Sequence, residues 1–271
     1  MLIKINPPAL RNFPRFEPGI MATSATKDIR PGLRPGSAIR RGPGRLPTGS
    51  PKLDRDQIIA CGLALSRTVP LQDLSIVRVA NALGVTPAMI HYHVEGRDVL
   101  TSAIVKRFMR ELVDVWPKPT GQWRPDLEAV ARTMYRHFLS YPGISAFFVA
   151  KNRYEIFTSA LEKDDEGALF EYLDLFFGAF RAIGLDADHI APYAIVFLQF
   201  IHSSAHHTAS HHWPVENKPL RSHLAKLETK GFDNIGFLRD SYLGVTGDAA
   251  FDAGLKLIVD GLEAERLSFK A

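Results

Sequence analysis

Residues 74–94 read LSIVRVANALGVTPAMIHYHV, and this stretch decides the fold of the N-terminal part of the chain. Ser75 is a typical N-cap residue. The apolar residues that follow it have the spacing of one helical stripe: Ile76, Val79, Ala80 and Leu83. Gly84 ends this helix, because only glycine adopts a positive φ without steric cost. Thr86 and Pro87 are a cap and a first-turn residue, so a second helix begins only two residues later.

The short connection between these helices indicates a helix-turn-helix. Ala80 is small enough to let the two helices cross closely, and Val85 fills the angle between them. In the second helix Ile90 and Val94 are four residues apart and are expected to face the core. The residues left to face outward are Pro87, Ala88, Met89, His91, Tyr92 and His93. Polar and aromatic side chains of this kind fit a DNA major groove, which is about 12 Å wide and admits one α-helix.

Helical periodicity continues on both sides of this motif. Asp54 is an N-cap residue for a helix ending near Arg67, and Gly96 introduces a longer helix that ends before Pro117. Further helices are expected at residues 123–140, 144–150, 153–162, 165–183, 186–211, 219–229 and 248–267. No stretch after Asp54 alternates like a strand. We therefore predict an all-α body, with an N-terminal three-helix helix-turn-helix domain and a larger helical domain.

Residues 1–52 differ from the rest of the chain in composition. Nine of the 18 prolines and six glycines fall within the first 53 residues, so no helical or strand period is sustained there. The same residues carry ten Lys and Arg against two acids, a net charge of +8, whereas the remainder carries −4. We expect a disordered basic arm. Its charge fits a polyanionic partner and a merely solvated tail equally well, and Met21 is a second candidate start of translation.

Composition also excludes several classes of protein. No stretch approaches the roughly 18 consecutive apolar residues needed to span a bilayer, and no apolar signal core is present, so we expect a cytoplasmic protein without membrane association. The single cysteine, Cys61, excludes an internal disulfide framework. No segment resembles a nucleophile and base pair or a phosphate-cradling loop, so we expect neither catalysis nor a cofactor.

The stretch from Asp54 to Leu112 resembles the DNA-binding domain of the TetR (tetracycline repressor) family of bacterial regulators. The resemblance rests on an ordered set of residues at the family's spacing: Ser75, Ala80, Gly84–Val85, Thr86, Ile90–His91–Tyr92–His93–Val94 and Arg97–Asp98–Val99–Leu100. His91 departs from the pattern, because the family's usual tyrosine stands at that position and Tyr92 follows it here. Arg97 replaces the family's lysine and keeps a positive charge that can bind a phosphate bidentately, with a surface ion pair as the alternative.

This resemblance implies a homodimer that binds a double-stranded DNA operator and is released by a small-molecule effector. It divides the chain into a basic arm (1–52), a DNA-binding domain (53–116) and a helical effector-binding and dimerisation domain (117–271). The predicted DNA-binding residues are Ser75, Thr86, Pro87, Ala88, Met89, His91, Tyr92, His93 and Arg97. Base contacts are expected from Ala88, Met89 and Tyr92, with core packing as the alternative for Met89. Arg40, Arg41 and Arg45 are predicted to enter the adjacent minor groove.

Two residue sets in the C-terminal part follow from the same resemblance. The last helix is expected to pair with helix 186–211 in a four-helix dimer interface. The predicted interface residues are Phe197, Ile201, Phe251, Gly254, Leu255, Ile258 and Leu262, although a stripe buried within one chain would give the same pattern. The predicted effector site is aromatic, with polar anchors, for an apolar or aromatic ligand. Its residues are His137, Phe138, Phe147, Asn152, Phe176, Phe180 and Gln199.

Histidines near the end of helix 186–211 raise an alternative function. His202 with His206, and His207 with His211, have the i, i+4 spacing that places two imidazoles on one helical face, as zinc and nickel sites require. No carboxylate lies nearby before Glu216, and histidine is also favoured at a helix C-terminus by the helix dipole. We therefore predict no metal site. A histidine-metal hydrolytic enzyme and a non-specific architectural DNA-binding protein are the alternatives to a repressor.

Overall fold

The computed structural model describes residues 53–150, 167–228 and 230–270, which contain helices and no strand. The all-α prediction is therefore confirmed. Arg40, Arg41, Arg45 and Asn152 lie outside the described residues, as does the helix predicted at 153–162. None of the described helices is long and apolar enough to cross a membrane.

The N-terminal elements follow the predicted order. They are α1 (Arg55–Leu65), the 3-10 turn η1 (Leu71–Asp73), α2 (Ile76–Leu83), α3 (Pro87–His93) and α4 (Arg97–Asp114). A capping box begins α1: the Asp54 carboxylate accepts from the Gln57 amide across 2.8 Å, and the Gln57 side chain accepts from the Asp54 amide across 3.2 Å. Two of the four free N–H groups of this helix end are thereby satisfied.

The remaining helices are α5 (Trp123–Leu139), α6 (Pro142–Ala150), α8 (Gly167–Arg181), α9 (Ala187–Ala209), α10 (Lys218–Lys226), α11 (Asp233–Leu243) and α12 (Gly247–Lys270). Helix α11 was not predicted, because its apolar residues form no buried stripe. Phe237 and Leu238 are adjacent and exposed, and only Leu243 is buried. Arg239 joins α11 to the end of α10 by donating to the carbonyl oxygens of Leu224 and Leu227, each across 3.3 Å.

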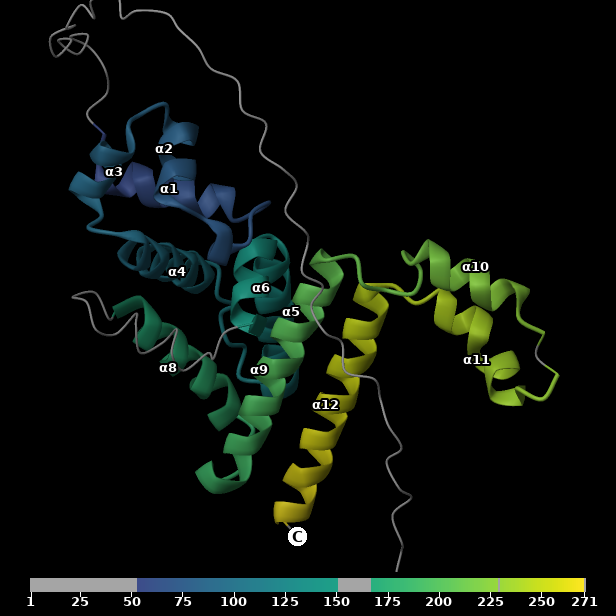
Figure 1. Cartoon of the computed structure of the whole chain (residues 1–271). Helices are drawn as coiled ribbons and strands as arrows, with labels where there is room; N and C mark the ends of the chain where they lie inside the picture. Colours follow the sequence, from purple (N-terminus) through teal and green to yellow (C-terminus); the bar gives the residue numbers. More distant parts are fainter. Residues whose placement is uncertain (1–52, 151–166, 229, 271) are drawn as a thin grey trace, which may run out of the picture. The chain divides into compact units, whose positions relative to one another are not determined.

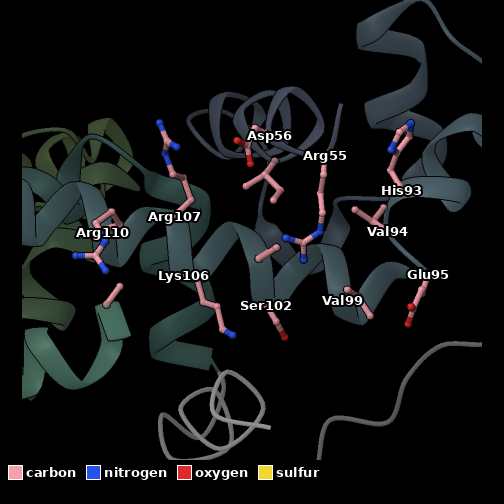
Figure 2. Close-up of a pocket in the computed structure, with 13 residues that line it drawn as sticks. Arg55, Asp56, His93, Val94, Glu95, Val99, Ser102, Lys106, Arg107 and Arg110 are labelled. Atoms are coloured by element: carbon pink, nitrogen blue, oxygen red, sulfur yellow. The ribbon is translucent and has the colours of Figure 1, made fainter. Parts of the chain in front are cut away.

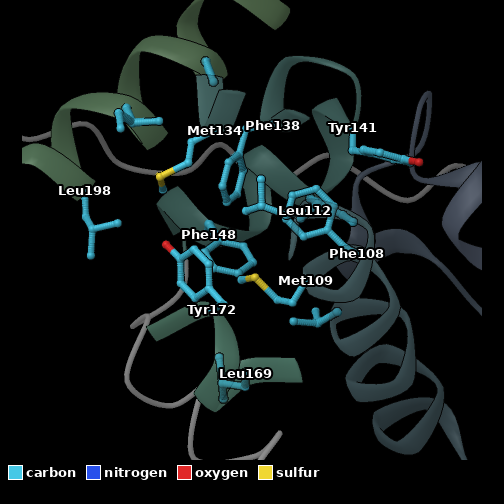
Figure 3. Packing of buried hydrophobic residues seen from close by; sticks show 14 of the residues in the cluster. Phe108, Met109, Leu112, Met134, Phe138, Tyr141, Phe148, Leu169, Tyr172 and Leu198 are labelled. Carbon is cyan, nitrogen blue, oxygen red and sulfur yellow. The ribbon is translucent and has the colours of Figure 1, made fainter. Parts of the chain in front are cut away.

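One cluster of buried apolar side chains extends from α1 to α12. Helix α1 packs against α2 and α4, α4 packs against α8, and α5 packs against α8, α9 and α12 (Figure 1). Figure 3 shows the part of this cluster to which α4 contributes Phe108, Met109 and Leu112. Because α4 contributes to the packing on both sides, the boundary predicted after residue 116 does not interrupt the core.

Helices α1 and α6 meet at Gly143. Its amide donates to the carbonyl oxygen of Ser66, the C-cap residue of α1, across 2.9 Å. A Cβ at this position would overlap the Val69 carbonyl oxygen, so only glycine permits the approach. Next to it, the Arg67 guanidinium lies 4.3 Å from the centre of the Tyr141 ring and donates to the Tyr141 hydroxyl across 3.0 Å. These contacts join the helix-turn-helix region to the helices that follow it.

Candidate nucleic-acid interface

The turn between α2 and α3 has the predicted geometry. Ser75 caps α2, because its hydroxyl oxygen accepts from the Arg78 amide across 3.2 Å. Gly84 is left-handed, with φ 68° and ψ 29°, and the Val85 amide donates to the Ala80 carbonyl oxygen across 3.0 Å. Ala80 is fully buried. The cap and the turn therefore lie at the residues that the sequence predicts.

Helix α3 separates into a buried and an exposed side, as the sequence predicts. Ile90 and Val94 are 0% and 1% exposed, whereas Tyr92 is 86% exposed. The other predicted outward residues fall into two groups. Pro87, Ala88 and His91 are exposed, whereas Met89 and His93 are half-buried. The rings of Tyr92 and His93 meet edge to face, with their centroids 5.2 Å apart. Tyr92 is therefore the most prominent side chain of this surface.

Thr86 occupies the N-cap position of α3 through its backbone alone. Its φ and ψ are −82° and 148°, but its side chain makes no capping hydrogen bond to the helix. The residue is exposed. The hydroxyl group is therefore not engaged in capping, and it faces the solvent beside the first turn of α3.

Arg97 has partners that the sequence did not indicate. Its Nε donates to the carbonyl oxygen of Leu74 across 3.2 Å, and its Nη2 donates to the carbonyl oxygen of Gln72. These acceptors lie in the segment that leads into α2. The guanidinium thus joins α4 to the start of the helix-turn-helix, in place of the surface ion pair considered from the sequence. A phosphate contact by the same side chain stays a prediction.

Arg78 is an exposed cation on α2 that sequence reasoning did not select. It lies two residues after Ile76 and one before Val79, both of which are buried. The signal was available, because a charged residue outside the apolar stripe of a short helix must face the solvent. Arg78 therefore adds a positive charge to α2.

The predicted effector residues form part of a packed aromatic interior. Phe138, Phe176 and Phe180 are buried, and Phe147 is half-buried. Phe138 lies 4.9 Å from Phe108 between ring centroids, and Phe180 lies 5.0 Å from Phe176. Pairs at such distances gain attraction beyond the burial of their area.

The two described polar anchors predicted for the effector, His137 and Gln199, differ in position. His137 Nε2 donates to the Phe108 carbonyl oxygen across 3.0 Å, which commits that nitrogen to the backbone of α4. Burial lowers the pKa of His137, so the neutral ring is favoured. Gln199 is exposed on α9. The structure thus gives His137 a packing role and leaves Gln199 at the surface.

The predicted dimer residues are instead part of the core of one chain. Phe197, Ile201, Phe251, Leu255 and Leu262 are all at most 2% exposed. Gly254 lies against the ring of Phe200, where a Cβ would overlap it, and Ile258 is half-buried. The alternative of a stripe buried within one chain is therefore correct, because α9 and α12 pack against each other through these faces. Their outer faces carry exposed apolar residues, namely Ile195, Val196 and Leu257.

Three histidine rings gather at the end of α9. The ring centroids of His206, His207 and His212 lie 5.7 to 6.1 Å apart. Burial lowers the pKa of His206, and the neighbouring imidazoles lower it further. Within the described ranges, no group of three or more His, Cys, Asp or Glu side chains is arranged to hold a metal ion. The histidine-metal alternative therefore gains no support from this cluster.

Comparison with known proteins identifies the family. Residues 117–266 match the model of the tetracyclin repressor-like C-terminal domain. No curated protein matches the chain. Among solved structures, apo ActR from Streptomyces coelicolor is similar, with a TM-score of 0.60 and 22% identity over 81% of this chain and 99% of that chain. ActR in complex with actinorhodin has a TM-score of 0.59 and 22% identity, over 80% and 99% of the two chains.

A third similar structure is a single-residue variant of TetR from Acinetobacter baumannii AYE in complex with minocycline. Its TM-score is 0.51 and its identity 19%, over 79% of this chain and 99% of that chain. At these identities the likenesses show a shared fold. The family model, however, spans more than half of the chain. The chain therefore belongs to the tetracycline repressor-like (TetR) family of transcriptional regulators.

Proposed function

We propose that this regulator is a repressor that binds a two-fold DNA operator through α3 and leaves it when a small apolar or aromatic effector binds. The observation that carries the proposal is the exposed side of α3. The cap of α2 and the buried apolar side chains of the helix-turn-helix hold this side in place. Tyr92 can donate a hydrogen bond to a base edge, whereas Pro87 and Ala88 can contact thymine methyl groups. We expect the Thr86 hydroxyl and the Arg97 guanidinium to contact phosphates, which would fix the register of the helix on DNA.

The basic arm extends this proposal to the minor groove. Arg40, Arg41 and Arg45 precede α1 in the sequence, in a Gly- and Pro-rich context. We expect them to bind phosphates or the minor groove and to release counterions. Deletion of residues 1–45 should then reduce the slope of log affinity against log salt concentration. An unchanged slope would contradict a role for the arm.

A two-fold operator requires two copies of α3, and the outer faces of α9 and α12 are the proposed contact between protomers. Ile195 and Val196 are 44% and 51% exposed on α9, and Leu257 is 74% exposed on α12. Gly261 lies one turn after Leu257, and a Cβ there would meet only open space. These side chains are apolar or small, so a second copy can approach closely and cover them.

Effector release requires a connection between the aromatic interior and the helix-turn-helix. We propose that the start of α6 and the residue before it form this connection, since Gly143 donates to Ser66 and Arg67 donates to Tyr141. The Tyr141 hydroxyl also donates to Glu111 of α4 across 2.7 Å. A ligand that shifts α6 would therefore change the support of both α1 and α4. It acts only if it binds the operator-free state more tightly than the operator-bound state.

Selection of bound fragments from random DNA tests the operator claim. We expect the full chain to enrich a two-fold motif, and Tyr92→Ala to abolish that enrichment. Tyr242→Ala is a matched control, because Tyr242 is an exposed tyrosine on α11. Enrichment of no motif, together with equal competition by any DNA, would favour the architectural alternative.

Effector release is tested on the selected operator by fluorescence anisotropy. Actinorhodin and minocycline are the first probes, because similar structures hold them. Release that saturates with either compound supports the effector claim. Failure of these compounds and of a wider panel of aromatic ligands would contradict it while leaving operator binding intact.

A further inference from the structure

A basic pocket lies beside α4 (Figure 2), and no Phe, Tyr or Trp side chain lines it. Its volume is about 710 Å³. Its walls come from the first turns of α1, from the connection between α3 and α4, from one face of α4 and from Ala168 at the start of α8. A volume of this size lies within the range of roughly 300 to 1,000 Å³ that is typical of small-molecule sites.

Positive charge dominates the lining of this pocket. Its four cations are Arg55 of α1 and Lys106, Arg107 and Arg110 of α4. Only two carboxylates, Asp56 and Glu95, line the same space. The lining residues alone therefore carry a net charge of +2 when His93 is neutral, and Glu111 and Glu171, which pair with Arg107 and Arg110, reduce the local charge. An excess of this kind attracts anions and raises their local concentration.

The four cations differ in how their charge is balanced. Arg107 lies 3.4 Å from Glu111, and Arg110 lies 2.6 Å from Glu171, in pairs that are about half exposed. Arg55 has no carboxylate within ion-pair distance among the residues that the structure describes. Arg55 comes from α1, whereas the other three lining cations come from α4. An anion in the pocket would thus be bound from two helices.

The rest of the wall strengthens such binding. Ser102 supplies a hydroxyl group on the same face of α4 as Lys106. Ile59 and Val99 add apolar side chains to the lining. A guanidinium matches the two oxygens of a carboxylate or of a phosphate group.

We propose that this pocket binds a small, multiply charged anion of the phosphate or polycarboxylate class. Its chemistry is opposite to that of the aromatic interior, so it is a second ligand site. A bound anion would add negative charge between α1 and the end of α3. Because DNA is attracted by positive charge near its binding surface, occupancy should lower operator affinity. This consequence rests on the proposed function, whereas the binding site itself does not.

Isothermal titration calorimetry of the full chain tests the site, with pyrophosphate and citrate as probes at constant ionic strength. We expect saturable binding of one anion per chain, and the comparison of the two probes distinguishes phosphate from carboxylate ligands. Arg55→Gln and Lys106→Gln should each weaken binding about tenfold, because each removes a charged donor. Arg136→Gln is the matched control, since it makes the same charge change at an exposed position of α5. Thermal melts by circular dichroism verify that the variants fold.

Several outcomes would overturn the proposal or its consequence for DNA binding. Heats that do not saturate, or equal weakening in Arg136→Gln, would show general charge attraction and an adventitious ion only. Loss of operator affinity in Arg55→Gln and Lys106→Gln, without binding of either probe to the wild type, would assign the pocket to DNA phosphates. Saturable pyrophosphate or citrate binding that leaves operator affinity unchanged supports the site and contradicts its effect on DNA.

Discussion

Arg97 Nε donates to the carbonyl oxygen of Leu74 across 3.2 Å, and this bond joins the first turn of α4 to the residue before the Ser75 cap. Helix α3 lies in the chain between the two joined points. The bond therefore closes a loop around the whole helix-turn-helix, in which Gly84 provides the turn. The same arginine that replaces the family's lysine is thus a structural residue of the DNA-binding region.

Arg97→Lys should destabilise the chain although it keeps the positive charge. An ammonium group cannot reproduce the two directed bonds to the carbonyl oxygens of Leu74 and Gln72. We expect the free energy of unfolding to fall by about 1–2 kcal/mol, as measured by urea denaturation followed by circular dichroism. Arg78→Lys, at an exposed position of α2, should change it by less than about 0.5 kcal/mol. Equal stability of both variants would contradict a structural role for Arg97.

Tyr92→Phe should weaken operator binding without changing stability. The ring is 86% exposed, so the core does not depend on its hydroxyl group. Loss of one hydrogen bond to a base corresponds to about 1 kcal/mol, or roughly a fivefold change in affinity. Anisotropy titrations with the selected operator measure this change, and Tyr242→Phe is the control. If Tyr92→Phe bound the operator with full affinity, the Tyr92 hydroxyl would not contact a base, and only the ring would remain as a contact.

Acid should destabilise the chain through His137. Burial lowers the pKa of this imidazole from its ordinary value of 6.5, so the unfolded chain takes up the proton at a higher pH than the folded chain does. The free energy of unfolding therefore falls as the pH drops below 6.5. His137→Gln keeps a donor for the Phe108 carbonyl oxygen and does not titrate, so it should flatten this dependence. His206, whose pKa is also lowered, should retain part of the slope. Urea titrations at several pH values measure it, and an unchanged slope would contradict the assignment.

Local signals in the sequence were sufficient to predict the helix-turn-helix. Ser75 as a cap and Gly84 as a left-handed turn act within three or four residues of their own positions, so they can be predicted without knowledge of the fold. The partners of Arg97, in contrast, cannot be predicted from local signals. The Leu74 carbonyl lies 23 residues away, and a backbone acceptor has no signature in the amino-acid sequence. Helix α11 was missed for a related reason, because Phe237 and Leu238 are exposed and give no stripe.

Periodicity identified the buried stripes of α9 and α12 but not what covers them. Phe251 and Leu255 have the spacing of a buried face, and that face is the same whether its partner belongs to one chain or to a second copy. The structure assigns it to the core of one chain. The aromatic interior shows the same limit. Phe138 and Phe176 are buried, and their role in effector binding stays a prediction. The position of a polar anchor such as Gln199 depends on the rotation of its helix.

Two glycines of α12 differ in what lies next to them: Gly254 packs against the core, and Gly261 lies at the proposed dimer face. A Cβ at Gly254 would overlap the Phe200 ring, so Gly254→Ala should lower the free energy of unfolding by about 1–3 kcal/mol through overpacking. Gly261 faces open space, so Gly261→Ala should gain up to about 1 kcal/mol of helix stability within one chain. The added methyl group should nevertheless weaken dimerisation, because it separates the two protomers where they approach closely. Urea denaturation and sedimentation equilibrium measure the two effects. A Gly261→Ala protein that dimerises like the wild type would place the dimer contact away from this face of α12.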